Sequence, residues 1–266
     1  MTAIEGKVVA VTGAASGIGR ALARELHARH AHLALSDVNE SGLAETERLL
    51  RGGTTRVTTH KVDVRDLAAM ERWAAAVSEA HGGADIIINN AGLTARGSIE
   101  QMAYEDFKLV IDVNLWGVVH GTRAFLPLLR GRPEGHIVNI SSINGMVPFA
   151  NNGPYNMSKY AVYGLNETLM QELHGERIRI TGVHPGGIRT DILRNARNFS
   201  ARNAALFDRV ARTSPEQAAR VILRAVENNQ QRCFVGADAK LMAFAKRLLP
   251  NLTVRVVGRV SGRALR

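Results

Sequence analysis

The chain has 266 residues, of which 45% are hydrophobic and 22% charged, and this composition fits one large globular domain, expected to span residues 1–266. The net charge is +10, but residues 240–266 hold two Lys, five Arg and no acid, and so carry +7 of it. The other 239 residues carry only +3, which argues against a protein that binds nucleic acid over its whole surface.

Short apolar runs alternate with longer amphipathic stretches along the chain. The runs predict seven strands, at residues 7–12, 32–37, 55–61, 86–89, 136–141, 179–184 and 232–235. The stretches between them predict helices at residues 18–29, 40–51, 66–81, 104–129, 155–174 and 215–228. Continuous apolar strands that alternate with helices predict an α/β fold, a doubly wound parallel sheet with helices on both faces.

The least regular stretch, residues 186–213, follows the sixth predicted strand. Ligands of such sheets bind beyond the carboxyl ends of the strands, so this stretch is expected to be a substrate loop that covers a site.

Cysteine usage and the first residues bear on the compartment. Cys233 is the single cysteine, so the chain forms no internal disulfide, as is typical of a reducing compartment. The N-terminal residues lack the apolar core of a signal peptide, and no run of about 18 apolar residues predicts a transmembrane helix. We therefore expect a cytoplasmic protein.

Three glycines, Gly13, Gly17 and Gly19, lie between the first predicted strand and the first predicted helix. Glycine lets the backbone N–H groups approach a pyrophosphate, and the helix N-terminus adds partial positive charge. The G-x3-G-x-G spacing differs from the G-x-G-x-x-G of many dinucleotide-binding proteins, so a tight turn without a ligand is the alternative.

The second predicted strand ends in Asp37, which can accept hydrogen bonds from both hydroxyls of an adenosine ribose and would repel a 2′-phosphate. This favours NAD over NADP, although Arg20 could reach a phosphate and weaken the preference. The alternative is that Asp37 caps the next helix. Asp63 and Val64, after the third strand, could bond the adenine edge or cap the helix that follows.

A tyrosine with a lysine four residues later places both side chains on one helical face, where the ammonium lowers the phenol pKa from about 10. Two pairs have this spacing, Tyr104/Lys108 and Tyr155/Lys159. Acids flank Tyr104 and would raise its pKa, whereas Tyr155 lies thirteen residues after Ser142, at the end of a predicted strand. We therefore predict Tyr155 as the general acid/base and Tyr104 as a helix-entry residue.

Seven motifs together resemble the short-chain dehydrogenase/reductase family in its single-domain form, over residues 6–236. They are TGAASGIG (12–19), DV (63–64), NNAG (89–92), VNLWG (113–117), NISS (139–142), YNMSK (155–159) and HPGGIRT (184–190). The resemblance implies a Rossmann-type sheet of order 3-2-1-4-5-6-7, a nicotinamide cofactor and a homo-oligomer, either a dimer or a tetramer.

The resemblance also implies the roles of single residues. Tyr155 would exchange a proton, Ser142 would orient the substrate oxygen, Lys159 would hold the nicotinamide ribose and lower the phenol pKa, and Asn114 would hold a water. The expected cofactor contacts, besides Tyr155 and Lys159, are Gly13, Ser16, Gly17, Ile18, Gly19, Asp37, Asp63, Val64, Asn90, Ala91, Gly92, Pro185, Gly186, Ile188 and Thr190. Four alternatives stay open: Ser141 in place of Ser142, Ser142 as only a hydroxyl at a strand end, a purely structural Asn114, and Asn89 with Asn90 as turn residues only.

The expected reaction interconverts a secondary alcohol and a ketone, and the expected substrate contacts are Ser142, Asn144 and Tyr155. Further candidate walls are largely apolar and favour a lipophilic substrate: Thr94, Met146, Val147, Gly187, Ile192 and Phe199. The alternatives are a cofactor-sensing regulatory or binding protein on the same scaffold, and a scaffold protein that binds anionic polymers. We expect no metal, because the histidines and the cysteine show no ligand spacing.

The basic C-terminal extension, residues 237–266, predicts an amphipathic helix with Leu241, Phe244 and Leu248 on one stripe, and this helix should stop near Pro250. It could pack on the domain or on a partner subunit. It could instead lie on an anionic membrane surface or close the substrate cleft.

Overall fold

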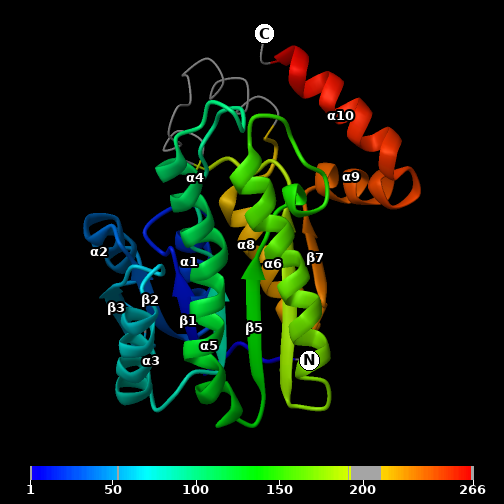
Figure 1. Ribbon diagram of the computed structural model, residues 1–266. Coiled ribbons are helices and arrows are strands. Elements are labelled where there is room, and N and C mark those ends of the chain that lie inside the picture. Colours follow the sequence, from blue (N-terminus) through cyan, green and yellow to red (C-terminus); the bar gives the residue numbers. More distant parts are fainter. Residues whose placement is uncertain (1, 53, 191, 193–210, 265–266) are drawn as a thin grey trace.

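A computed structural model describes residues 2–52, 54–190, 192 and 211–264. Its centre is a seven-stranded sheet in the order β3-β2-β1-β4-β5-β6-β7, and every neighbouring pair is parallel (Figure 1). This confirms the predicted sheet and its strand order. The strands are β1 (Val8–Thr12), β2 (His32–Asp37), β3 (Val57–Lys61), β4 (Ile86–Asn89), β5 (Gly135–Ile140), β6 (Ile178–Pro185) and β7 (Arg232–Val235).

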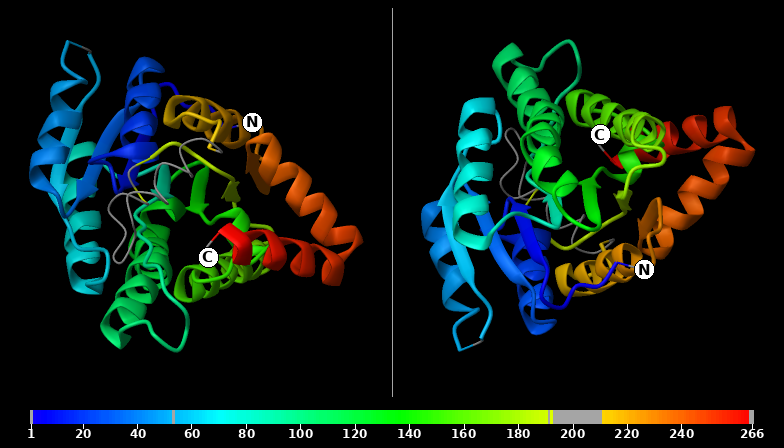
Figure 2. Two further views of the ribbon diagram at one scale, coloured as in Figure 1. Left: turned by 90° about the horizontal axis from the view of Figure 1, so that it is seen from above. Right: turned by 90° about the horizontal axis from the view of Figure 1, so that it is seen from below.

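Helices cover both faces of the sheet (Figure 2). One face carries α1 (Gly17–Ala28), α2 (Glu40–Arg48) and α8 (Pro215–Glu227), and the other carries α3 (Leu67–His81), α5 (Gly117–Arg130) and α6 (Gly153–Glu172). Apart from α5, which is the last part of the predicted helix 104–129, the predicted helices lie within a few residues of these bounds.

Each face has its own apolar core. Leu22 and Leu26 of α1 pack with Ile222 of α8 on the first face. On the second face Trp73 and Phe125 meet edge to face, with ring centroids 4.8 Å apart. Because the central strands are covered on both faces, β1, β4 and β5 are buried along their whole length. Apolar runs without alternation were therefore the correct signal for these strands.

The predicted helix 104–129 is interrupted. It consists of α4 (Tyr104–Ile111), a π-helical turn η1 (Asp112–Trp116) and α5. The π-helical turn carries the fully buried Asn114 into the interior, where its side chain bonds the backbone of Leu93.

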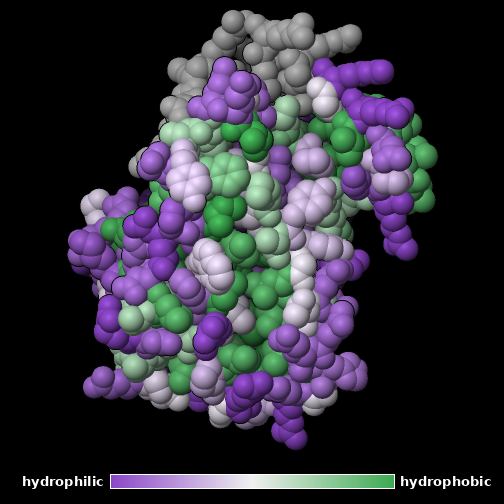
Figure 3. All heavy atoms as spheres, in the orientation of Figure 1, coloured by the Kyte–Doolittle hydropathy of each residue, from purple (hydrophilic) through white to green (hydrophobic). Residues whose placement is uncertain are grey.

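The end of the chain also differs from the prediction. The expected helix is present as α9 (Ala237–Leu248) and stops before Pro250, as predicted, but a further helix that was not predicted, α10 (Pro250–Ala264), begins at this proline. Proline is well tolerated in the first turn of a helix, because its missing N–H would have no partner there. Figure 3 shows apolar and charged residues side by side on this part of the molecule.

The topology fixes where ligands meet the sheet. The neighbours of β1 are β2 on one side and β4 on the other, so the chain changes direction across the sheet between them. In open α/β sheets the crevice at the carboxyl ends of such strands is the binding site.

Candidate active site

The turn between β1 and α1 leaves no room for side chains. Gly13 has a φ of +68°, and a Cβ on it would lie 2.8 Å from Ala91 Cα. A Cβ on Gly19 would lie 2.0 Å from the Gly13 carbonyl oxygen. Asn90 secures the turn, because its side-chain amide donates to the carbonyl oxygens of Thr12 (2.9 Å) and Gly13 (3.1 Å). At Gly13 and Gly19 the turn therefore has room for backbone only.

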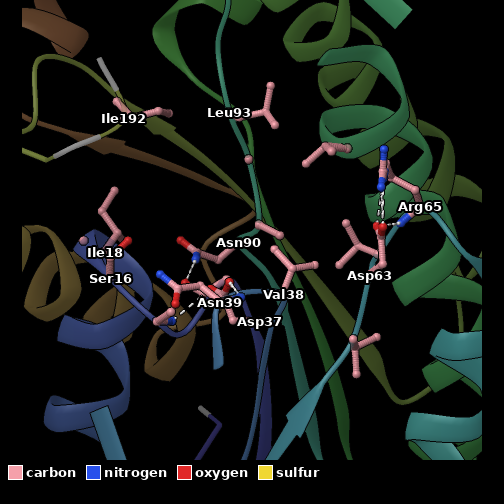
Figure 4. A pocket seen from close by; sticks show the side chains of 18 of the residues that line it. Ser16, Ile18, Asp37, Val38, Asn39, Asp63, Arg65, Asn90, Leu93 and Ile192 are labelled. Carbon is pink, nitrogen blue, oxygen red and sulfur yellow. Dashed lines mark hydrogen bonds and ion pairs between the residues drawn. The ribbon is translucent and has the colours of Figure 1, made fainter. Parts of the chain in front are cut away.

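A cavity of about 530 Å³ lies over this turn (Figure 4). We name it the cofactor cavity. Its walls include most of the predicted cofactor contacts: Gly13, Ser16, Gly17, Ile18, Asp37, Asp63, Val64, Asn90, Ala91, Gly92 and Thr190. Gly19 instead lies beneath the turn, against Gly13.

Asp37, at the end of β2, has its carboxylate oriented by backbone donors on this cavity wall. One carboxylate oxygen accepts from Ala15 N (3.0 Å) and the other from Asn39 N (2.9 Å). The residue that caps α2 is Asn39, whose side chain accepts from Gly42 N (3.0 Å). The alternative role of Asp37 as that cap is therefore wrong.

At this end of the cavity the arginine that lines the wall is not the one that the sequence indicated. Arg20 donates to Thr46 Oγ1 (3.0 Å) and to the Gly42 carbonyl oxygen (3.1 Å), and it is not among the residues that line the cavity. Arg65, which the sequence did not single out, lines the cavity instead and pairs with Asp63.

The Arg65 guanidinium holds the pKa of the Asp63 carboxyl below its usual range. Asp63 does not cap α3, because Asp66 does so through Ala69 N (3.2 Å). An adenine contact by Asp63 would have to share the carboxylate with Arg65.

A second cavity of about 430 Å³ lies beside the first, and we name it the substrate cavity. Ser142, Asn144, Tyr155, Lys159, Pro185, Gly186 and Ile188 are among its walls. The two cavities share Ile18, Asn90, Gly92, Thr190 and Ile192. The two cavities are therefore adjacent, at the carboxyl ends of the strands.

Strand β5 and helix α6 bring the three candidate catalytic side chains together. Ser142 lies just beyond the end of β5, and Tyr155 lies in the first turn of α6 with Lys159 one turn later. Ser142 and Tyr155 line the same cavity, and the Ser142 hydroxyl favours the charged form of the Tyr155 phenol. The Ser142 hydroxyl also accepts from Asn144 N (3.1 Å). The Lys159 ammonium lies 5.5 Å from the centroid of the Tyr155 ring and donates to the Ile140 carbonyl oxygen (2.9 Å).

The expected lowering of the Tyr155 pKa is not seen. Burial raises the pKa of the phenol, and the Ser142 hydroxyl only opposes that effect. Burial also lowers the pKa of Lys159 to about 8. Both shifts have the same cause, because a buried site disfavours the charged form of either group.

The structure separates the alternatives for serine and tyrosine. Ser141 donates to the Lys159 carbonyl oxygen (2.8 Å), whereas Ser142 faces Tyr155. Tyr104 is the first residue of α4 and is 74% exposed, and Lys108 forms an ion pair with Asp112. The geometry favours Ser142 and Tyr155.

Asn114 has all its side-chain bonds inside the protein. Its oxygen accepts from Leu93 N (2.9 Å), and its nitrogen donates to the Leu93 carbonyl oxygen (2.9 Å) and to Ser158 Oγ (3.2 Å). A Cβ on Gly92 would lie 3.3 Å from the Asn114 oxygen and 3.6 Å from the Lys159 nitrogen. Asn114 therefore positions the segment that faces Lys159, and its side-chain amide is already occupied.

The beginning of the predicted substrate loop crosses both cavities. Ile188 pairs with Thr213 in an isolated parallel bridge, and a Cβ on Gly17 would lie 3.3 Å from a Thr190 methyl group. Gly187 N donates to the carboxylate of Asp238 in α9 (2.7 Å). Helix α9 therefore holds the loop at its start.

The predicted walls are only partly correct. Thr94, Asn144, Gly187 and Ile192 line the substrate cavity, and Phe199 lies outside the described residues. Met146 and Val147 are not among the residues that line this cavity, and they pack in a small apolar cluster beneath α9. The walls that the sequence did not indicate include Arg96, Phe149, Asp238 and Met242.

Comparison with known proteins agrees with this geometry. The family model for short chain dehydrogenase matches residues 7–201. The chain belongs to the short-chain dehydrogenase/reductase family. It is therefore an NAD(P)-dependent oxidoreductase, with a small-molecule substrate and a nucleotide cofactor.

Relatives of this family member extend over nearly the whole chain. A Mycobacterium tuberculosis protein that carries the name oxidoreductase SadH is 41% identical, over 97% of this chain and 96% of its own. Dehydrogenase/reductase SDR family member 7B of Bos taurus is 33% identical, over 96% of this chain and 81% of its own.

A solved short-chain dehydrogenase/reductase of Burkholderia phymatum, in complex with NAD, is 30% identical with a TM-score of 0.85. The match covers 93% of this chain and 96% of the other. In the described part of this chain, no helix is long and apolar enough to span a bilayer.

Proposed function

We propose that this oxidoreductase prefers NAD and interconverts a secondary alcohol and a ketone, with Tyr155 as the general acid/base. One observation carries the proposal: the cofactor cavity, with its glycine turn and Asp37, shares walls with the substrate cavity, which Ser142 and Tyr155 line together. A bound nicotinamide would supply or accept a hydride at the junction of the two.

The cofactor cavity fits NAD. The bare backbone at Gly13 and the positive end of α1 suit a pyrophosphate. The two Asp37 oxygens each accept one backbone bond and keep lone pairs for two ribose hydroxyls. A 2′-phosphate would place its charge beside this carboxylate, and Arg65 already pairs with Asp63.

The protonation states suit proton transfer in both directions. Because burial raises its pKa, the Tyr155 phenol is neutral at pH 7 and can donate a proton to a ketone oxygen. Alcohol oxidation needs the phenolate, so its rate should rise with pH. The Lys159 ammonium is charged below its pKa of about 8, and in that range it stabilises negative charge on the phenol.

The substrate cavity favours a lipophilic molecule. Phe149, Ile188, Ile192 and Met242 contribute apolar walls, while Ser142 and Tyr155 supply hydroxyls at the reacting end. Ser142 orients the substrate oxygen, since its hydroxyl lines the same cavity as the Tyr155 phenol that exchanges the proton.

The test is a panel of secondary alcohols and ketones of rising hydrophobicity, assayed with NAD(H) and NADP(H). We expect Tyr155→Phe to lower kcat about 1,000-fold, within the range for loss of a general acid/base, while the Kd of NADH changes less than about threefold. The matched control is Tyr104→Phe, which removes the hydroxyl from the exposed tyrosine of the same spacing and should leave kcat unchanged. Undiminished turnover by Tyr155→Phe would refute the role of Tyr155, and a strong preference for NADP would refute the role of Asp37.

A further inference from the structure

The last two helices form a separate feature, the C-terminal arm, which we define as α9 and α10. It lies beside the carboxyl end of the sheet, and α10 extends away from the helical layers (Figures 1 and 2). The inner side of the arm is packed: Ala239, Met242 and Val257 join an apolar cluster that includes Ile143 and Val147. The arm is therefore anchored to the domain on one side.

The outer side of the arm is apolar and exposed. Leu241, Phe244 and Leu248 follow one another at helical spacing on α9, and they are 68, 63 and 60% exposed. Leu249 and Leu252 extend this apolar stripe across the junction with α10. Large apolar side chains gathered in this way on a surface mark a binding site.

The same arm is strongly basic. Its described side chains include five cations, Lys240, Lys246, Arg247, Arg255 and Arg259, and Asp238 is its only acid. Within the described residues, none of the five lies in an ion pair, and Asp238 accepts from Gly187 N instead. Apolar and charged residues adjoin here on the space-filling surface (Figure 3).

We propose that the C-terminal arm docks on an anionic lipid surface, with the apolar stripe in the interface and the cations among the headgroups. Charge decides between this occupant and a second copy of the chain. Symmetric pairing of two arms would bring five cations of one copy near five of the other, whereas an anionic bilayer offers both apolar depth and negative charge.

The arm also connects this surface with the site. Asp238 and Met242 of α9 line the substrate cavity, while Leu241 and Phe244 of the same helix are exposed. Docking would therefore hold the substrate cavity next to the bilayer. Access of a membrane-dissolved substrate to this cavity rests on the proposed lipophilic substrate. Docking itself does not, because vesicle binding is measured without turnover.

The test is flotation of the full-length protein with vesicles of phosphatidylcholine alone and with vesicles that contain one third phosphatidylserine. We expect binding to the anionic vesicles, weaker binding at high salt, and little binding to phosphatidylcholine. Lys246→Glu with Arg247→Glu should lower the partition coefficient at least about tenfold, because each cation near the surface contributes about fivefold. The triple variant Leu241→Ser, Phe244→Ser and Leu248→Ser should lower the partition coefficient by a similar factor, because it removes the apolar stripe.

The matched control is Arg51→Glu with Arg224→Glu, which changes the net charge equally at exposed positions outside the arm and should cost less than about threefold. Thermal melting confirms that each variant folds. Absence of wild-type binding to the anionic vesicles, or equal binding by the arm variants, would overturn the proposal. So would light scattering that shows a dimer which the stripe variant dissociates, because the stripe would then be covered by a second copy.

Discussion

The cofactor cavity and the substrate cavity lie side by side but are built in different ways. The cofactor cavity is formed at the ends of β1 to β4, by backbone packed so tightly that Gly13 and Gly19 cannot carry a side chain. The substrate cavity is formed by side chains from β5, α6, the loop after β6 and α9. The first depends on close approach of main chain, and the second on contacts between distant segments.

This difference predicts that the two cavities respond to different kinds of substitution. Adding a single methyl group should damage the cofactor cavity, because backbone there cannot move aside. The substrate cavity should tolerate small changes of volume but respond to loss of the polar contact that α9 makes with the loop.

The largest effect in this comparison is expected for Gly19→Ala. The added Cβ would lie 2.0 Å from the Gly13 carbonyl oxygen, so the turn must open. Overpacking of this kind costs up to about 3 kcal/mol, and we expect the Kd of NADH, measured by fluorescence titration, to rise about 100-fold.

Gly164→Ala is the matched control, because a Cβ there meets nothing within 4 Å. It lies inside α6 and should raise the free energy of unfolding by about 0.5–1 kcal/mol without changing the Kd. Normal NADH binding by a folded Gly19→Ala would show that the turn is not fixed by close packing.

A smaller effect is expected for Asp37→Ala. Loss of a charged acceptor for ribose hydroxyls removes about 2 kcal/mol, so the ratio of kcat/KM with NAD to that with NADP should fall about 30-fold. Asn39→Ala is its control: it removes the cap of α2 and about 1 kcal/mol of stability, but should leave this ratio unchanged. An unchanged ratio in Asp37→Ala would contradict the assignment of cofactor preference.

The smallest effect is expected for Asp238→Ala, which removes the acceptor of Gly187 N. The start of the substrate loop would shift, and small displacements near a reacting group cost up to about 100-fold. We expect the KM of the ketone to rise about tenfold and the Kd of NADH to change less than about threefold. Asp238→Asn keeps an oxygen acceptor and should restore most of the lost affinity for the ketone. Equal losses in both variants would point to the charge of Asp238 and not to its bond.

Much of this protein was predictable because the signals are local. Buried parallel strands appear as apolar runs, and a helix after a glycine turn needs only a few neighbouring residues. The candidate groups on α6 are equally local, since Tyr155 and Lys159 are one helical turn apart. The choice of Tyr155 over Tyr104 needed only flanking acids and the distance along the chain to Ser142.

Tertiary structure decided what depends on partners far along the chain. Whether Arg20 or Arg65 lines the cofactor cavity depends on which acceptors each finds, and the side chain of Asn114 is occupied because the π-helical turn carries it beside Leu93. Burial, which the sequence does not show, raises the pKa of Tyr155 where the nearby lysine alone would lower it. Helix α9 ends before Pro250 and α10 begins at it. Whether a helix begins at this proline depends on the residues that follow it. The sequence left the contact of α9 with the substrate cleft as one alternative among several. The folded chain decided it, because Asp238 and Met242 of α9 line the substrate cavity more than 80 residues after Tyr155.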